Sequence, residues 1–168
     1  FLSARSPFVF PDGEEIEARK AHTFFDEPLG DFASFLKIFR MYAQAADKEK
    51  FCKLYFLEYR IMAEIVSIKE QLELIVSDMG VPILSGGKIE DYLTAVASGM
   101  IQFVCVSQGR GSYGSLTTEK IFIHPGSCMY KEKEQFIVAG EIVRTSRMYA
   151  MSVSPLSKKI IEEVAPAL

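Results

Sequence analysis

Hydrophobic and polar residues change their spacing once along this chain, near Gln102. Before that point, apolar residues recur every three or four positions, which is the period of a helix with one buried face. After it, short runs at residues 103–106, 120–123 and 136–139 are rich in β-branched and aromatic residues, which predicts strands. We therefore predict an α+β protein, with a helical domain at residues 1–102 and a β-domain with a terminal helix at residues 103–168.

The first domain is predicted to be a bundle of helices. Asp12 is expected to cap a short polar helix that ends before Pro28, and Asp31 to cap the next one. The longest helix should run unbroken from about residue 50 to residue 79, roughly 45 Å, as the spine of the domain. A further helix follows a glycine-rich break. The apolar face of the longest helix is formed by Phe51, Leu54, Ile61, Ile65, Ile68, Leu72, Ile75 and Met79.

The second domain is predicted to hold five strands within about 50 residues, which suits a small, partly open barrel of the OB type. The face and loops of such barrels bind single-stranded nucleic acid. Residues 109–114 match the dinucleotide-binding pattern G-x-G-x-x-G, but a strand rather than a helix follows, so we interpret them as a hairpin loop. Residues 131–134 are interpreted as a charged hairpin tip, and residues 155–168 as a short helix.

Composition narrows the class of protein. No apolar run approaches the roughly 20 residues of a membrane span, and no signal peptide stands at the start, so we expect a cytoplasmic protein without a membrane partner. Because the first residue is Phe1, we expect a piece of a longer protein. Its cysteines lack the spacing of metal ligands, so we expect no metal. We expect the cysteines to be free, buried thiols. They are Cys52, Cys105 and Cys128.

The formal net charge of −3 conceals a difference between the two parts. Residues 1–102 contain 11 basic and 16 acidic side chains, a balance of −5, whereas residues 103–168 contain 8 and 6, a balance of +2. Neither part is basic enough to indicate nucleic-acid binding by composition alone. If the chain binds RNA, the positive charge must be local.

Several motifs resemble the closing β-domain of the DEAH-box RNA helicases, in the order and approximate spacing of that family. They are Ile123-His124-Pro125-Gly126-Ser127, then residues 141–149 (Glu-Ile-Val-Arg-Thr-Ser-Arg-Met-Tyr), then Val164-Ala-Pro166. Upstream, residues 27–31, 51–52, 56–60 and 68–72 resemble segments of the helical domain that precedes it. The resemblance covers residues 14–168. It implies the helical ratchet-like domain and OB-fold domain at the C-terminal end of a bacterial-type, ATP-dependent DEAH-box RNA helicase.

This resemblance implies a function and a set of residues. The chain would bind single-stranded RNA largely without sequence specificity and help to close the RNA channel. Asp31, His124 and Ser127 would have structural roles in turns. The candidate RNA-binding residues are Tyr59, Arg60 and Lys69 on the long helix, Arg110 and Tyr113 in the hairpin loop, and Thr145, Ser146, Arg147 and Tyr149 at the last turn.

The chain also departs from the family. The family's arginine after Tyr113 is replaced by Gly114, the chain has no tryptophan where the family has one, and Tyr149-Ala-Met151 lacks a family cation. Lys88 follows two glycines but is succeeded by Ile89, so no phosphate-binding loop is present. We therefore expect no enzyme activity, with ATP and Mg bound only by motor domains elsewhere in the longer protein.

Other functions remain open at this stage. The chain could instead be a protein-interaction module that docks on the motor domains or on an activator protein, because its helical part is acidic. An enzyme centred on His124 ranks last, since no partner residue for catalysis can be named. The expected partners are single-stranded RNA, the motor domains of the same chain and an activator, with the protein acting as a monomer.

Overall fold

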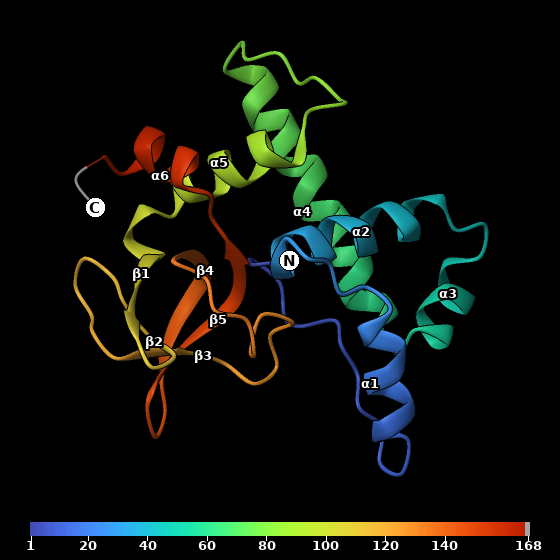
Figure 1. Cartoon of the computed structure of the whole chain (residues 1–168). Helices are drawn as coiled ribbons and strands as arrows, with labels where there is room; N and C mark the ends of the chain where they lie inside the picture. Colours follow the sequence, from blue (N-terminus) through green and yellow to red (C-terminus); the bar gives the residue numbers. More distant parts are fainter. Residues whose placement is uncertain (167–168) are drawn as a thin grey trace. The chain divides into compact units, whose positions relative to one another are not determined.

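The structure is a computed structural model that describes residues 1–166 (Figure 1). Its residues pack into two compact units, one formed by residues 1–25 and 35–86, the other by residues 26–34 and the chain from residue 87 onward. The first unit is helical and the second contains a five-stranded barrel with helices, which confirms the α+β class. The change from helix to strand near Gln102 therefore falls inside the second unit.

The first unit has an aromatic core. Its helices are α1 (Glu15–Thr23), α2 (Gly30–Gln44) from residue 35 onward, α3 (Lys48–Leu54) and α4 (Tyr59–Asp78). Asp12 does not cap α1, because Glu14 occupies the position before the helix. The helices bury Phe25, Ile38, Tyr42, Cys52, Leu57, Met62 and Ile65 in one cluster.

The prediction of one unbroken helix from residue 50 to residue 79 is wrong. Phe56 has a left-handed backbone conformation (φ 53°), which a continuing helix excludes. The backbone here bonds to the start of the chain instead. The Val9 N–H donates to the Phe56 carbonyl (2.9 Å), and the Glu58 N–H donates to the Pro7 carbonyl (2.7 Å). These bonds separate α3 from α4.

The second unit contains a closed barrel with strand order β1-β2-β3-β5-β4. The β3 and β5 strands pair in parallel, and the other pairs are antiparallel. Because β3 pairs with β5 and not with β4, the prediction of a hairpin tip at residues 131–134 is wrong. Those residues lie in a long connection that passes from β3 to β4. The strands are β1 (Val104–Gly109), β2 (Ser112–Gly114), β3 (Ile121–Ile123), β4 (Phe136–Arg144) and β5 (Met148–Pro155).

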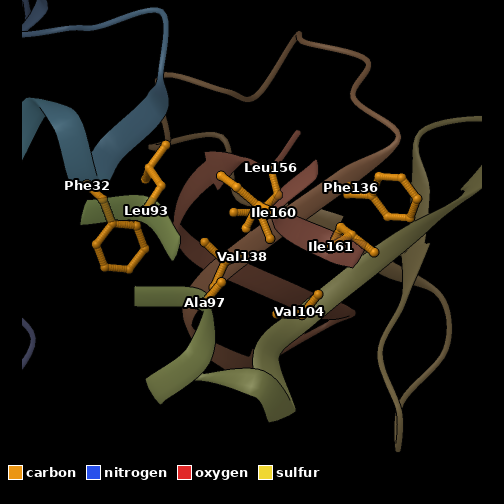
Figure 2. Packing of buried hydrophobic residues seen from close by; sticks show 9 residues of the cluster. All are labelled: Phe32, Leu93, Ala97, Val104, Phe136, Val138, Leu156, Ile160 and Ile161. Atoms are coloured by element: carbon orange, nitrogen blue, oxygen red, sulfur yellow. The ribbon is translucent and has the colours of Figure 1, made fainter. Parts of the chain in front are cut away.

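Helices pack on the barrel through a second apolar cluster, separate from the barrel interior. Figure 2 shows its side chains converging from α5 (Ile89–Gly99), the strands and α6 (Lys158–Val164). A single turn of 3-10 helix, η1 (Ile101–Phe103), leads from α5 into β1. The terminal helix is shorter than predicted, since β5 extends to Pro155; residues 167 and 168 of that prediction lie outside the described residues. The cluster comprises Phe32, Leu93, Ala97, Val104, Phe136, Val138, Leu156, Ile160 and Ile161.

Asp31 joins residues 26–34 to the barrel within the second unit. Its carboxylate accepts hydrogen bonds from the Ser127 hydroxyl, the Cys128 N–H (3.1 Å) and the Val153 N–H (2.7 Å). The predicted helix-capping role of Asp31 is therefore replaced by a cross-link between distant segments. Gly30 beside it has φ +82°, and a Cβ there would lie 2.5 Å from the Ser154 Cα. Only glycine fits this close approach.

Candidate nucleic-acid interface

The outer face of β3 and β5 presents aromatic rings. Strand β3 alternates, with Ile121 and Ile123 buried in the barrel and Phe122 half-exposed between them. In the parallel register, Phe122 pairs with Tyr149 of β5, which is also half-exposed. Because successive side chains of a strand point to opposite faces, both rings lie on the outside of the barrel. A small barrel more often has polar residues there.

Arg147 adds a positive charge to this face from the turn between β4 and β5. Its guanidinium carbon lies 5.1 Å from the centre of the Phe122 ring, a cation–π contact. The turn is closed by the Thr145 N–H, which donates to the Arg147 carbonyl (2.9 Å), and Thr145 and Ser146 are exposed. None of the ion pairs found among residues 1–166 involves Arg147. Its charge is therefore available to a ligand.

His124 borders the same face. Its ring meets that of Tyr149 at 82°, with the centres 5.5 Å apart. Its Nδ1 accepts a hydrogen bond from the Gly126 N–H (3.0 Å), so the proton of a neutral ring is on Nε2. The His124 N–H also donates to the Ala150 carbonyl (3.0 Å), which ties the turn to β5. We call Phe122, His124, Arg147 and Tyr149 the outer-face strip.

Ser127 is one turn further along and does not belong to the strip. Its hydroxyl donates to the Asp31 carboxylate and accepts a hydrogen bond from the Met129 N–H (3.1 Å). Cys128 next to it is half-buried, and burial raises the pKa of its thiol to about 12. Burial likewise raises the pKa of Cys52 to about 11 and that of Cys105 to about 12. The three thiols are free; Cys52 and Cys105 are buried, whereas the Cys128 thiol lies near the Asp31 carboxylate and the Glu27 carbonyl.

Tyr113 is not available for stacking, contrary to the sequence interpretation. Only 3% of it is exposed, and its ring packs in the barrel interior. Its hydroxyl accepts a hydrogen bond from the Glu134 N–H (3.3 Å), which fixes the connection from β3 to β4. Burial raises the pKa of this phenol. Tyr113 is thus a core residue, and a base could reach its ring only if the barrel opened.

Arg110 lies at the tip of the β1–β2 hairpin. Its backbone has a left-handed conformation (φ 54°), and so do those of its two neighbours, Gly109 (φ 83°) and Gly111 (φ 77°). Its side chain is exposed, and no ring contact of Arg110 occurs in the part of the chain that the structure describes. Arg110 is therefore a cation on a solvated tip.

The helical candidates form a separate set in the first unit. Tyr59 and Arg60 occupy the first positions of α4 and are exposed. Lys69 is already engaged, since it forms a salt bridge with Glu73 and lies 5.8 Å from the centre of the Phe39 ring. Its charge is therefore partly neutralised before any ligand binds.

The end of α4 and the loop after it expose an apolar segment. The apolar face of α4 is buried at Ile65, but its side chains are exposed to solvent from residue 72 onward. The sequence pattern predicts one continuous buried stripe instead. Residues 70–87 contain three acidic side chains and no lysine or arginine. The exposed apolar side chains are Leu72, Leu74, Ile75, Met79, Val81, Ile83 and Leu84, with Leu84 87% exposed.

Comparison with known proteins decides the relationship. Residues 93–168 match the family of Oligonucleotide/oligosaccharide-binding (OB)-fold domains. The chain is 36% identical over 166 residues to the ATP-dependent RNA helicase HrpA of Borreliella burgdorferi, and the match covers 98% of this chain. The chain is a homologue of the C-terminal region of DEAH-box ATP-dependent RNA helicases. This confirms the resemblance found in the sequence.

Two further helicases match over nearly the whole chain. The probable ATP-dependent RNA helicase DHX35 of Homo sapiens is 26% identical over 168 residues, covering 98% of this chain. The HrpA homolog of Haemophilus influenzae is 27% identical over 176 residues, covering 99%. The matched region is only 20%, 24% and 13% of the Borreliella, human and Haemophilus helicases, respectively. The helicase-related chain is thus much shorter than these relatives.

No helix within residues 1–166 combines the length and the apolar character that crossing a bilayer requires. In the same residues, no group of three or more His, Cys, Asp or Glu side chains is placed to hold a metal ion.

Proposed function

We propose that this chain holds single-stranded RNA on the outer-face strip, as an accessory part of an ATP-dependent DEAH-box RNA helicase. The observation behind the proposal is that two half-exposed rings share the outer face of an OB-fold barrel with a guanidinium that is in none of the ion pairs found among residues 1–166. Aromatic rings stack on any base, and cations attract the phosphate backbone. The strip offers few groups for reading base edges, so binding should depend little on sequence.

Further cations near the strip support this proposal. Lys120 and Arg147 immediately precede Ile121 and Met148, which pair in the β3–β5 register, and Arg144 pairs with Met148 from the other side. All three are exposed. They provide a local positive surface on a protein with a net charge of −3. RNA binding by so few cations should be weak and sensitive to salt.

In the longer helicase, this surface would hold the strand and help to close the RNA channel while motor domains hydrolyse ATP with Mg. The homologues are named as ATP-dependent RNA helicases, which supports ATP use by the longer protein. We expect the 168-residue chain alone not to hydrolyse ATP. A phosphate-release assay with and without RNA checks this, and turnover well above the blank would contradict it.

Fluorescence anisotropy with a labelled single-stranded oligouridine tests the RNA proposal. We expect Arg147→Ala to weaken binding about three- to tenfold and to lower the slope of log affinity against log salt by about 0.7. Tyr149→Leu should weaken it about fivefold or more through lost stacking. Lys159→Ala on α6 is the matched control, since it removes an exposed cation elsewhere in the same unit that is in none of the ion pairs found among the described residues.

Two results would overturn the RNA proposal. One is the absence of binding at low salt. The other is an equal loss for Lys159→Ala and Arg147→Ala, because this would show that only net charge matters. An unchanged affinity for Tyr149→Leu together with a normal salt slope would limit the site to phosphate contacts.

A second candidate function is docking on another protein, and the exposed apolar segment at residues 72–84 favours it. Seven large apolar side chains are exposed there beside acidic groups, which repel RNA. The motor domains of the same helicase are the expected partner. Binding of purified motor domains should be insensitive to salt and lost in Leu72→Asp. Equal binding by Leu72→Asp, or a steep loss with salt, would exclude this candidate.

A further inference from the structure

We infer that Phe122 is a positioning residue for Arg147, so that the ring beneath the guanidinium sets RNA affinity together with the charge. The inference rests on the proposed RNA-binding function, but the contact itself can be tested without RNA. Its basis is the cation–π contact between the β4–β5 turn and the outer face of β3.

The contact follows from the sheet register. Met148 pairs with Ile121, the first residue of β3. Arg147, which precedes Met148, therefore lies beside the start of β3, close to the first outward-facing residue of that strand. That outward residue is Phe122, because its neighbours on both sides are buried in the barrel. The turn is closed by the Thr145–Arg147 hydrogen bond (2.9 Å). The backbone and the ring therefore both restrict Arg147.

This arrangement leaves Arg147 ready to bind a phosphate. A cation–π contact uses the face of the guanidinium, whereas hydrogen bonds to phosphate oxygens use the N–H groups on its edge. An unrestricted arginine loses rotamer freedom when it binds, and a side chain that is already held loses less. Removing the ring should therefore weaken binding while the charge remains.

Two other candidate RNA-binding cations differ from Arg147. Lys69 also lies near a ring, that of Phe39, but its salt bridge with Glu73 engages the charge. Arg110 is exposed but has no ring contact among the described residues. Among these three, Arg147 alone combines a ring contact with an unengaged charge. We expect Arg110→Ala to weaken RNA binding by less than about twofold, compared with three- to tenfold for Arg147→Ala.

The first test is nuclear magnetic resonance of the 168-residue chain without RNA. The Arg147 side-chain protons should be shifted upfield by the ring current of Phe122. They should move to the values of a free arginine in Phe122→Leu and stay shifted in Phe122→Tyr, which keeps the ring. Free-arginine shifts in the unmodified chain would overturn the inference, whatever the outcome of the RNA experiment.

The second test measures RNA affinity in a double-mutant cycle. Phe122→Leu should weaken binding about three- to tenfold with the salt slope nearly unchanged, and Phe122→Tyr should restore it. Arg147→Ala combined with Phe122→Leu should bind no worse than Arg147→Ala alone. Additive losses, or equal losses for the Leu and Tyr variants, would overturn the inference.

Controls separate the possible failures. Leu116→Ala removes an exposed apolar side chain from the same unit and should leave affinity unchanged. Circular dichroism and thermal melting establish whether each variant is folded. If Phe122→Leu does not fold, the chemical shifts of the Arg147 side chain in the unmodified chain and in Phe122→Tyr still decide whether the ring contact exists. If the ring-current shift is present but no RNA binds, the proposed function has failed while the Phe122–Arg147 contact stands.

Discussion

Each of the two units presents one surface with apolar side chains, and the two surfaces differ in the kind of side chain and in the charges beside it. The barrel unit buries its aliphatic residues and exposes aromatic rings beside cations, as at Phe122, Tyr149 and Arg147. The helical unit buries Phe25 and Tyr42 in its core, and in residues 72–84 it exposes aliphatic residues beside acids. Exposed apolar surface thus has two different chemistries in one chain. Rings with cations suit a nucleic acid, whereas aliphatic groups with acids suit a protein.

The structural supports of the two surfaces also differ. The outer-face strip is built on paired strands whose connections are held by specific contacts, including the Asp31 carboxylate and the close approach at Gly30. The apolar segment lies at the end of one helix and in the loop after it. Substitutions that test these supports sharpen the comparison, and they are ordered here by expected effect.

The largest effect is expected for Gly30→Ala. A Cβ at this position would lie 2.5 Å from both the Ser154 Cα and the Val153 carbonyl oxygen, and the backbone has φ +82°. Because backbone atoms cannot move aside cheaply, the substitution should lower the free energy of unfolding of the barrel unit by more than about 3 kcal/mol. Urea unfolding followed by circular dichroism measures this change.

Gly111→Ala is the matched control for this experiment. Gly111 has a similar φ of +77°, but a Cβ there would meet nothing within 4 Å. Gly111→Ala should therefore lower the free energy of unfolding only by the conformational strain of the backbone, about 1 kcal/mol. If both substitutions had the same effect, the packing of residues 26–34 against β5 would contribute nothing to stability, and the support proposed for the strip would be lost.

The next effect contrasts two isoleucines of α4. Ile65 is 3% exposed and Ile75 is 56% exposed, although the sequence places both on the predicted apolar stripe. Ile65→Ala should cost about 3 kcal/mol through the lost burial and the cavity, whereas Ile75→Ala should change stability by no more than about 0.5 kcal/mol. Thermal or urea unfolding of the two variants checks this.

A large loss in the free energy of unfolding for Ile75→Ala would contradict the comparison between the two units. It would mean that residues 72–84 are buried in solution against something, such as a second copy of the chain. Sedimentation at several protein concentrations would then identify self-association, which should disappear in Leu72→Asp. Small costs at Ile75 leave the segment free for a partner.

The sequence predicted the order of helices and strands well because periodicity reports which face of an element is buried. Prediction from the sequence failed where contacts between distant segments determine the local structure. The break at Phe56 depends on bonds to Val9 and Pro7, so no local signal marks it. The exposure of residues 72–84 is also invisible to periodicity, because an amphipathic stripe has the same pattern whether it faces a core or a partner.

The candidate site was predictable only in part. Arg147 and Tyr149 were named as candidates through the family resemblance at residues 141–149. Phe122 was not named, because the parallel pairing of β3 with β5 joins residues 27 positions apart. The alternation Ile121-Phe122-Ile123 was the available signal for an outward ring. Tyr113 was misassigned for the converse reason, since a tyrosine near a glycine-rich loop does not reveal which face of the barrel it occupies.

The smallest predicted effect concerns His22 and the pH dependence of the helical unit. Its Nε2 donates a hydrogen bond to the Phe56 carbonyl (2.9 Å), and its ring makes T-shaped contacts with those of Phe8 and Phe10. Burial lowers the pKa of His22 below its ordinary value of 6.5 by more than the hydrogen bond to the Phe56 carbonyl raises it. Because the unfolded chain takes up this proton more readily, the contribution of His22 to stability is present above about pH 6.5 and declines as the pH falls below it.

We therefore expect the helical unit to melt at a lower temperature at pH 5 than at pH 7, by a few degrees at most. His22→Gln, whose side-chain amide can still donate to the Phe56 carbonyl, should flatten this dependence. The range from pH 5 to pH 7 lies above the ordinary range of carboxylate titration, so the difference between the two proteins isolates the imidazole. An identical pH dependence in His22→Gln would show that the break between α3 and α4 does not rely on a neutral histidine, and would leave the backbone bonds of Val9 and Glu58 as its support.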